Sequence, residues 1–99
     1  MRHRVARLAD LPEGSGYRVE VEGREVALFR RGDRVFALEG ICPHRGALLA
    51  FGEVRDGVAY CPLHAWAFEL ETGRCRDPEG IRLETLPVLV EGGEVLIEL

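Results

Sequence analysis

Two short segments decide how this chain is organised: Cys42-Pro43-His44-Arg45-Gly46 and Cys61-Pro62-Leu63-His64-Ala65-Trp66. Each segment contains one cysteine, followed directly by proline, and one histidine. The spacing is C-x-H in the first segment and C-x-x-H in the second, and sixteen residues separate His44 from Cys61. Two thiolates and two imidazoles at such spacings are ligands for iron–sulfur clusters or for zinc. The two segments therefore predict a metal centre.

These motifs resemble those of the Rieske proteins, in which two histidines replace two of the four cysteines that hold a [2Fe–2S] cluster. The resemblance implies that Cys42 and Cys61 bind one iron and that His44 and His64 bind the other. Neutral imidazoles remove two negative charges compared with an all-cysteine cluster, so an added electron meets less repulsion. The reduction potential rises to roughly −150 to +300 mV as a result. The cofactor implied is one Rieske-type [2Fe–2S] cluster.

Five neighbours of the ligands are expected to support this site. Gly46 would let the backbone pass close to the cluster. Trp66 is expected in the core, where it would also exclude water from the cluster, and Leu63 is expected to shield it. Arg45 is either a solvated charge or a cation that faces a partner. Pro78 lies where the Rieske family has a third, proline-containing loop that covers the cluster.

The two segments lack features of the high-potential Rieske proteins. Those proteins have an additional cysteine in each segment, and these two cysteines form a disulfide. They also have a serine whose hydroxyl donates a hydrogen bond to a bridging sulfide. Residues 44–47 and 62–66 contain neither, and Ala65 stands where the family usually has glycine. Fewer hydrogen bonds to sulfur stabilise the reduced cluster less. We therefore expect a potential at the low end of the Rieske range, which suits a carrier that accepts electrons from NAD(P)H through a flavin.

Outside the two segments, the pattern of apolar residues is that of an all-β protein. Residues 17–21 alternate strictly between apolar and polar side chains. Residues 47–51 are compatible with either a helical turn or an extended crossing. Three hairpins with Gly-containing turns are expected: Val26–Arg30 with Arg34–Leu38, Ala67–Leu70 with Arg74–Arg76, and Glu84–Val90 with Val95–Leu99.

Short strands with glycine turns at near-regular spacing predict an all-β sandwich or barrel. The Rieske resemblance implies an antiparallel β sandwich or barrel with a small inserted cluster-binding subdomain. On this basis residues 1–99 form a single domain. The cluster-binding subdomain covers about residues 40–80, and residues 1–39 and 81–99 form the base.

Composition narrows the functional class. The net charge is −4 and no basic stripe is visible, so nucleic acid binding is not expected. No apolar run approaches eighteen residues and the start has no signal-peptide pattern, so we expect a cytoplasmic protein with no membrane partner. The third cysteine, Cys75, is interpreted as a buried or semi-exposed packing residue; a third thiolate ligand or a redox-active thiol is the alternative. His3 is interpreted as a solvated surface residue.

The sequence indicates electron transfer and no catalysis by this chain alone, because it has neither a nucleotide-binding glycine motif nor an open 2-His-1-carboxylate iron site. The resemblance implies a Rieske ferredoxin that passes electrons from a flavoprotein reductase to an oxygenase.

The alternative is the small subunit of an assimilatory NAD(P)H-dependent nitrite reductase, with an NAD(P)H-linked large subunit as donor and a nitrite reductase component as acceptor. Residues 61–74 and 87–95 are similar to that type. A permanent subunit should expose a contiguous apolar patch beyond the cluster. A zinc-bound interaction module, or a disulfide between Cys42 and Cys61, are the remaining interpretations of the motif.

Overall fold

The computed structural model describes residues 1–42, 46–62, 66–77 and 79–99. Five residues of the predicted site lie outside these ranges: His44, Arg45, Leu63, His64 and Pro78. The described elements, in chain order, are β1 (Arg2–Arg7), η1 (Leu8–Asp10), β2 (Gly16–Val21), β3 (Arg24–Arg31), β4 (Arg34–Glu39), η2 (Leu49–Phe51), β5 (Val54–Arg55), β6 (Val58–Tyr60), β7 (Ala67–Glu69), β8 (Cys75–Asp77), β9 (Thr85–Leu86), β10 (Val88–Glu91) and β11 (Glu94–Glu98).

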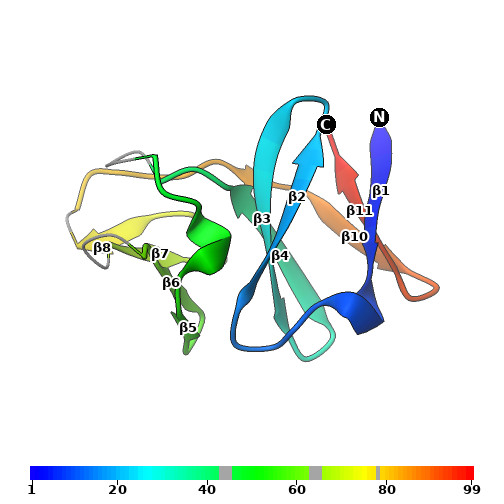
Figure 1. Ribbon diagram of the computed structural model, residues 1–99, viewed down its shortest axis with the longest axis horizontal. Coiled ribbons are helices and arrows are strands. Elements are labelled where there is room, and N and C mark those ends of the chain that lie inside the picture. The colour runs from blue at the N-terminus through cyan, green and yellow to red at the C-terminus, as the bar shows by residue number, and fades with distance from the viewer. Residues whose placement is uncertain (43–45, 63–65, 78) are drawn as a thin grey trace.

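The strands form three sheets, in the orders β1-β11-β10, β2-β3-β4-β9 and β5-β6-β7-β8. Every pairing between these strands is antiparallel. Figure 1 shows the β2-β3-β4-β9 sheet in the middle, with the β5–β8 sheet on one side and the β1-β11-β10 sheet on the other. The prediction of an antiparallel all-β fold is confirmed. Within the described ranges, no helix is long and apolar enough to cross a membrane.

The middle sheet buries both of its faces. Four consecutive residues of β3, from Val26 to Phe29, are buried. Since successive side chains of a strand point to opposite faces, Val26 and Leu28 enter a core shared with the β1-β11-β10 sheet. Ala27 and Phe29 enter a second core, shared with η2 and the β5–β8 sheet. The continuous apolar run in β3 is therefore the sequence signature of a strand with a layer on each side.

The first two predicted hairpins are present. Strands β3 and β4 pair from Val26↔Glu39 to Arg31↔Arg34, and β7 pairs with β8. Strand β2 shows the expected alternation, with the polar side chains of Arg18 and Glu20 exposed.

The last predicted hairpin is partly wrong. Of the residues expected in the first arm of this hairpin, only those of β10 pair with β11, whose other edge pairs with β1. Strand β9, which was expected in the same arm, pairs instead with β4, through Leu38↔Thr85 and Ala37↔Leu86. Pro87 separates the two strands. It has no N–H to continue a ladder, although its carbonyl accepts a hydrogen bond from the Glu98 N–H at 3.0 Å. The chain therefore changes sheets at Pro87.

The undecided segment 47–51 contains a short 3₁₀ helix, η2. This segment packs closely on neighbouring backbone at Ala50 and at Gly52, the residue that follows the helix. A Cβ on Gly16 would lie 2.6 Å from the Cα of Ala50, and a Cβ on Gly52 would overlap the Tyr60 carbonyl oxygen. The two glycines therefore allow η2 to sit directly against β2 and against the end of β6, one residue before Cys61.

Candidate metal centre

The first predicted ligand loop grows from a hydrogen-bonded stem. The Gly40 N–H donates to the carbonyl of Glu25 at 2.9 Å, and the Leu49 N–H donates to the carbonyl of Gly40 at 2.8 Å. The loop itself is closed by the Cys42 N–H, which donates to the carbonyl of Ala47 at 2.8 Å. The stem thus continues the middle sheet from β4 up to the first cysteine.

Gly46 fits this loop because of its backbone conformation. Its φ is +71°, in the left-handed region that favours glycine. Its N–H donates to the carbonyl of Cys42 at 2.9 Å. Among the described residues nothing crowds the position where its Cβ would be, so the tight turn accounts for glycine here.

The second loop, between β6 and β7, is closed in the same way. The Cys61 N–H donates to the carbonyl of Trp66 at 2.8 Å. In both loops, therefore, the amide of the cysteine bonds to the carbonyl five residues later. The two predicted histidines lie inside these closed loops, at positions outside the described residues.

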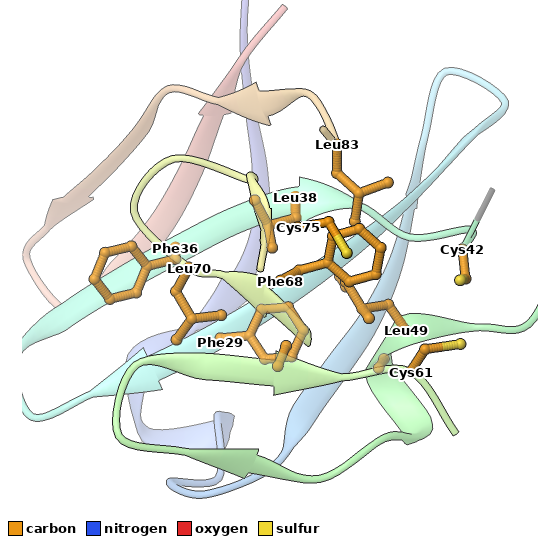
Figure 2. Packing of buried hydrophobic residues seen from close by; sticks show 13 residues of the cluster. Phe29, Phe36, Leu38, Cys42, Leu49, Cys61, Phe68, Leu70, Cys75 and Leu83 are labelled. Carbon is orange, nitrogen blue, oxygen red and sulfur yellow. The ribbon is translucent and has the colours of Figure 1, made fainter. Parts of the chain in front are cut away.

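The loops bring two of the four predicted ligands to one place. Cys42 and Cys61 are both buried and belong to the same hydrophobic core as Leu49 and Phe68. Figure 2 shows the two thiol side chains together at one end of this core, each arriving from its own loop. Cys42 forms no disulfide, so the disulfide interpretation does not describe the structure. Two thiols at the same end of the apolar core, which we call the apolar floor of the centre, fit a cluster that needs two thiolates on one iron.

Cys75 occupies a different part of the same core. It is fully buried at the start of β8, and its N–H donates to the carbonyl of Ile81 at 2.8 Å. Figure 2 places it near Phe68 and Leu83, while the two loop cysteines lie at the edge of the core. This confirms that Cys75 is buried, among the apolar residues of the core.

Both aromatic residues after the second loop pack on this core, as predicted for Trp66. Phe68 is fully buried, and Trp66 is half-buried and packs against the same core. Trp66 therefore packs against the core that contains Cys61, and its carbonyl closes the loop.

The outer face of the β7–β8 hairpin is charged, a feature not predicted from the sequence. Glu69 accepts hydrogen bonds from Arg76 Nε at 3.0 Å and from Thr72 Oγ1 at 2.9 Å. The hydrogen bond from Arg76, then that from Thr72, hold the pKa of Glu69 below its ordinary value. Glu71 binds Arg34 at 2.8 Å and so ties this hairpin to the β3–β4 turn. The alternation of polar residues around the Thr72-Gly73 turn is the sequence feature from which this charged face could have been predicted.

Glu69 should make stability depend on pH in the acidic range. Because its pKa is lower in the folded protein than in the unfolded chain, its contribution to the free energy of unfolding is complete above the unfolded pKa of about 4.3. The contribution is lost as the pH falls below that value and through the folded pKa. We expect Glu69→Gln to have a lower melting temperature than the wild type at pH 7, and the difference to disappear in strong acid. Thermal unfolding at several pH values measures this; a difference that is independent of pH would contradict it.

Comparison with known proteins identifies the family. Residues 1–87 match the model of the Rieske [2Fe-2S] domain. The ferredoxin component of the alkene monooxygenase system of Xanthobacter autotrophicus is 38% identical over 94% of this chain and 77% of its own length. The ferredoxin of carbazole 1,9a-dioxygenase from Nocardioides aromaticivorans superimposes with a TM-score of 0.92 and 33% identity, over 98% of this chain and 96% of that chain.

Two further solved structures have similar folds. One is an assigned NADH-dependent nitrite reductase small subunit from Mycobacterium tuberculosis, with a TM-score of 0.90 and 28% identity over 98% of this chain and 93% of that chain. The other is a complex of reduced oxygenase and oxidised ferredoxin in carbazole 1,9a-dioxygenase, with a TM-score of 0.88 and 33% identity over 97% of this chain and 91% of that chain. With a family model that spans most of its length and relatives that match almost all of it, this chain belongs to the Rieske [2Fe–2S] domain family.

Proposed function

We propose that Cys42, His44, Cys61 and His64 hold the [2Fe–2S] cluster that this Rieske protein carries, with the cysteines on one iron and the histidines on the other. The observation that supports this most directly is the equivalence of the two loops. Each cysteine closes its own loop through the same hydrogen bond, and both thiols are buried at one end of one core. The histidines follow these cysteines by two and three residues.

The same proposal treats residues 1–99 as one domain with a cluster-binding subdomain at about residues 40–80. The β5–β8 sheet, which begins at Val54 and ends at Asp77, lies inside these bounds. Its core includes Ala27 and Phe29 of the base. A shared core favours one folding unit over two separable ones.

We propose that the chain is a one-electron carrier, a Rieske ferredoxin that accepts electrons from a flavoprotein reductase and delivers them to an oxygenase. The cluster supplies a site that takes up and releases one electron. The protein shields it with an apolar floor and fixes its loops. Relatives that are ferredoxin components of a monooxygenase and a dioxygenase system support this role, as does the ferredoxin–oxygenase complex in the carbazole system. A carrier supplied by NAD(P)H through a flavin would work in the cytoplasm.

The second candidate function is the small subunit of an NAD(P)H-dependent nitrite reductase, which the similarity to the M. tuberculosis structure favours. The amount of exposed apolar surface distinguishes a free carrier from a permanent subunit. Near the metal centre, the large apolar residues that the structure shows as exposed are Ile41 and Phe51. A permanent interface takes roughly 20–30 residues from each partner. Within the described residues, which do not include 43–45 and 63–65, two exposed apolar side chains fall short of that, and we therefore favour the carrier. Oxygenase turnover with catalytic amounts of the chain would support it, whereas stable co-elution with an NAD(P)H-linked large subunit would support the alternative.

Electron paramagnetic resonance of the dithionite-reduced protein tests the cofactor and its ligands together. We expect a rhombic signal with a low average g value, as a mixed histidine and cysteine environment produces. Protein-film voltammetry should give a midpoint potential at the low end of the roughly −150 to +300 mV range, because residues 44–47 and 62–66 have no hydroxyl to donate to sulfur. A protein with no signal and with bound zinc would overturn the proposal in favour of a structural zinc module.

A further inference from the structure

Three arginines, Arg74, Arg76 and Arg82, form an exposed patch beside the metal centre, which we call the arginine face. They alternate with residues that point inward: Cys75 lies between the first two, and Leu83 follows the third, and both are buried. All three arginine side chains therefore lie on the outer side of the β7–β8 hairpin and of the segment that pairs with it.

The arrangement of these charges is unfavourable for the chain alone. Arg74 and Arg82 are direct partners in an antiparallel bridge. Side chains at such positions share a face, and like charges placed directly opposite each other destabilise the pair. Among the described residues, neither of these two guanidinium groups is in an ion pair, and Glu69 pairs only with Arg76. The carboxylates of Glu71 and Glu84 in the same segments pair with Arg34 and Arg24. Arg74 and Arg82 therefore keep positive charge that no ion pair among the described residues compensates, on a chain whose net charge is −4.

Hydrogen bonds hold the arginine face in a fixed shape. The Arg82 Nε donates to the carbonyl of Thr72 at 3.0 Å, and the Arg74 N–H donates to the Thr72 hydroxyl oxygen at 3.1 Å. The same hydroxyl donates to Glu69, which holds Arg76. The backbone and two guanidinium groups, those of Arg76 and Arg82, are thus positioned before any partner binds, which reduces the entropy lost on binding.

The position of the face connects it to electron transfer. Strand β7 begins one residue after Trp66, whose carbonyl closes the second loop. Phe68 and Cys75, on the inner side of the hairpin, are in the same core as the two loop cysteines (Figure 2). A partner seated on the outer side of this hairpin would therefore lie at the flank of the metal centre.

We propose that the arginine face is a docking surface for an acidic patch on the electron-transfer partner, next to that partner's own redox centre. This rests on the proposed carrier function and adds the surface chemistry of the partner. A positive patch on an otherwise acidic carrier orients the molecule as it approaches, so the metal centre faces the partner at encounter. Complementary charges of this kind act mainly on association rates and are weakened by salt.

The test uses a gold electrode coated with a carboxylate-terminated monolayer as the acidic probe. Arg74→Gln is compared with Arg7→Gln, which removes an exposed arginine from β1 that is likewise outside the ion pairs of the described residues. Both variants have the same net charge. We expect the interfacial electron-transfer rate of Arg74→Gln to fall by about three-fold or more at low ionic strength, with Arg74→Gln/Arg82→Gln lower still, and the difference to shrink near 0.5 M salt. Arg7→Gln should stay close to the wild type.

Two controls separate the possible failures. The midpoint potential of Arg74→Gln should match that of the wild type. Its melting temperature should match or exceed that of the wild type, because the substitution removes a contact between like charges. Equal losses in Arg74→Gln and Arg7→Gln would overturn the inference, since net charge alone would then explain them. Retention of duplex DNA that depends on Arg74 would overturn it too, in favour of a nucleic acid ligand. Absence of any voltammetric wave in the wild type would instead overturn the carrier function itself.

Discussion

Replacing Cys61 with serine should eliminate the cluster. A serine hydroxyl is a poor substitute for a soft thiolate on iron, and Cys61 is buried at the position where its loop closes. We expect the purified Cys61→Ser protein to be colourless, to contain little iron, and to give no electron paramagnetic resonance signal after reduction. Cys42→Ser should behave in the same way, because its loop has the equivalent closure.

Cys75→Ala is the matched control for this experiment. Cys75 is as buried as Cys42 but lies among the apolar residues of the core, so removal of its thiol should cost some stability while the spectrum and the iron content stay those of the wild type. Loss of the cluster in Cys75→Ala together with its retention in Cys61→Ser would show that the ligands have been assigned wrongly.

Truncating Phe68 to alanine should have the largest effect on stability. Its side chain is fully buried in the core between the metal centre and the middle sheet. Phe→Ala changes in such positions cost about 3–5 kcal/mol, a large part of the roughly 5–15 kcal/mol that stabilises a typical protein. The melting temperature should fall by more than about 15 °C, and the protein should lose its cluster more readily as the floor beneath the loops collapses.

Leu89→Ala provides the comparison for Phe68→Ala. Leu89 lies on β10, away from that core, and is among the exposed large apolar residues. Its truncation should change the free energy of unfolding by no more than about 0.5 kcal/mol. Thermal or denaturant unfolding of the two variants measures the difference; similar losses would mean that the core beside the metal centre does not dominate stability.

The elements that local sequence patterns control were predicted well. The β3–β4 hairpin was predictable because two apolar runs flank the Gly32 turn, where φ is +59°. The loops were recognisable from residue type and spacing, and the structure adds their common closure. The burial of Phe68 and Cys75 followed from their apolar character. In each case the deciding residues are close together in the chain.

Features that depend on distant residues were not predictable in this way. The sheet change at Pro87 required knowing that β4 has a free edge for β9. The interpretation of His3 as a solvated residue was wrong: it is only partly exposed, with its Nε2 3.4 Å from the Glu22 carboxylate. The arginine face arises because the 74 and 82 positions meet across a bridge, which no short-range pattern indicates.

Because both faces of the middle sheet are buried, the structure limits the ways in which such a carrier can take an electron from one partner to another. Alternate residues of β3 anchor the layers on its two sides, and the Arg34–Glu71 pair fastens the same two parts at the surface. A swing of the cluster-bearing layer on a hinge would expose Ala27 and Phe29 to water. The whole molecule therefore has to dissociate from one partner and diffuse to the next as a rigid body. The time between the two encounters is then set by the rates of dissociation and collision rather than by an internal domain motion.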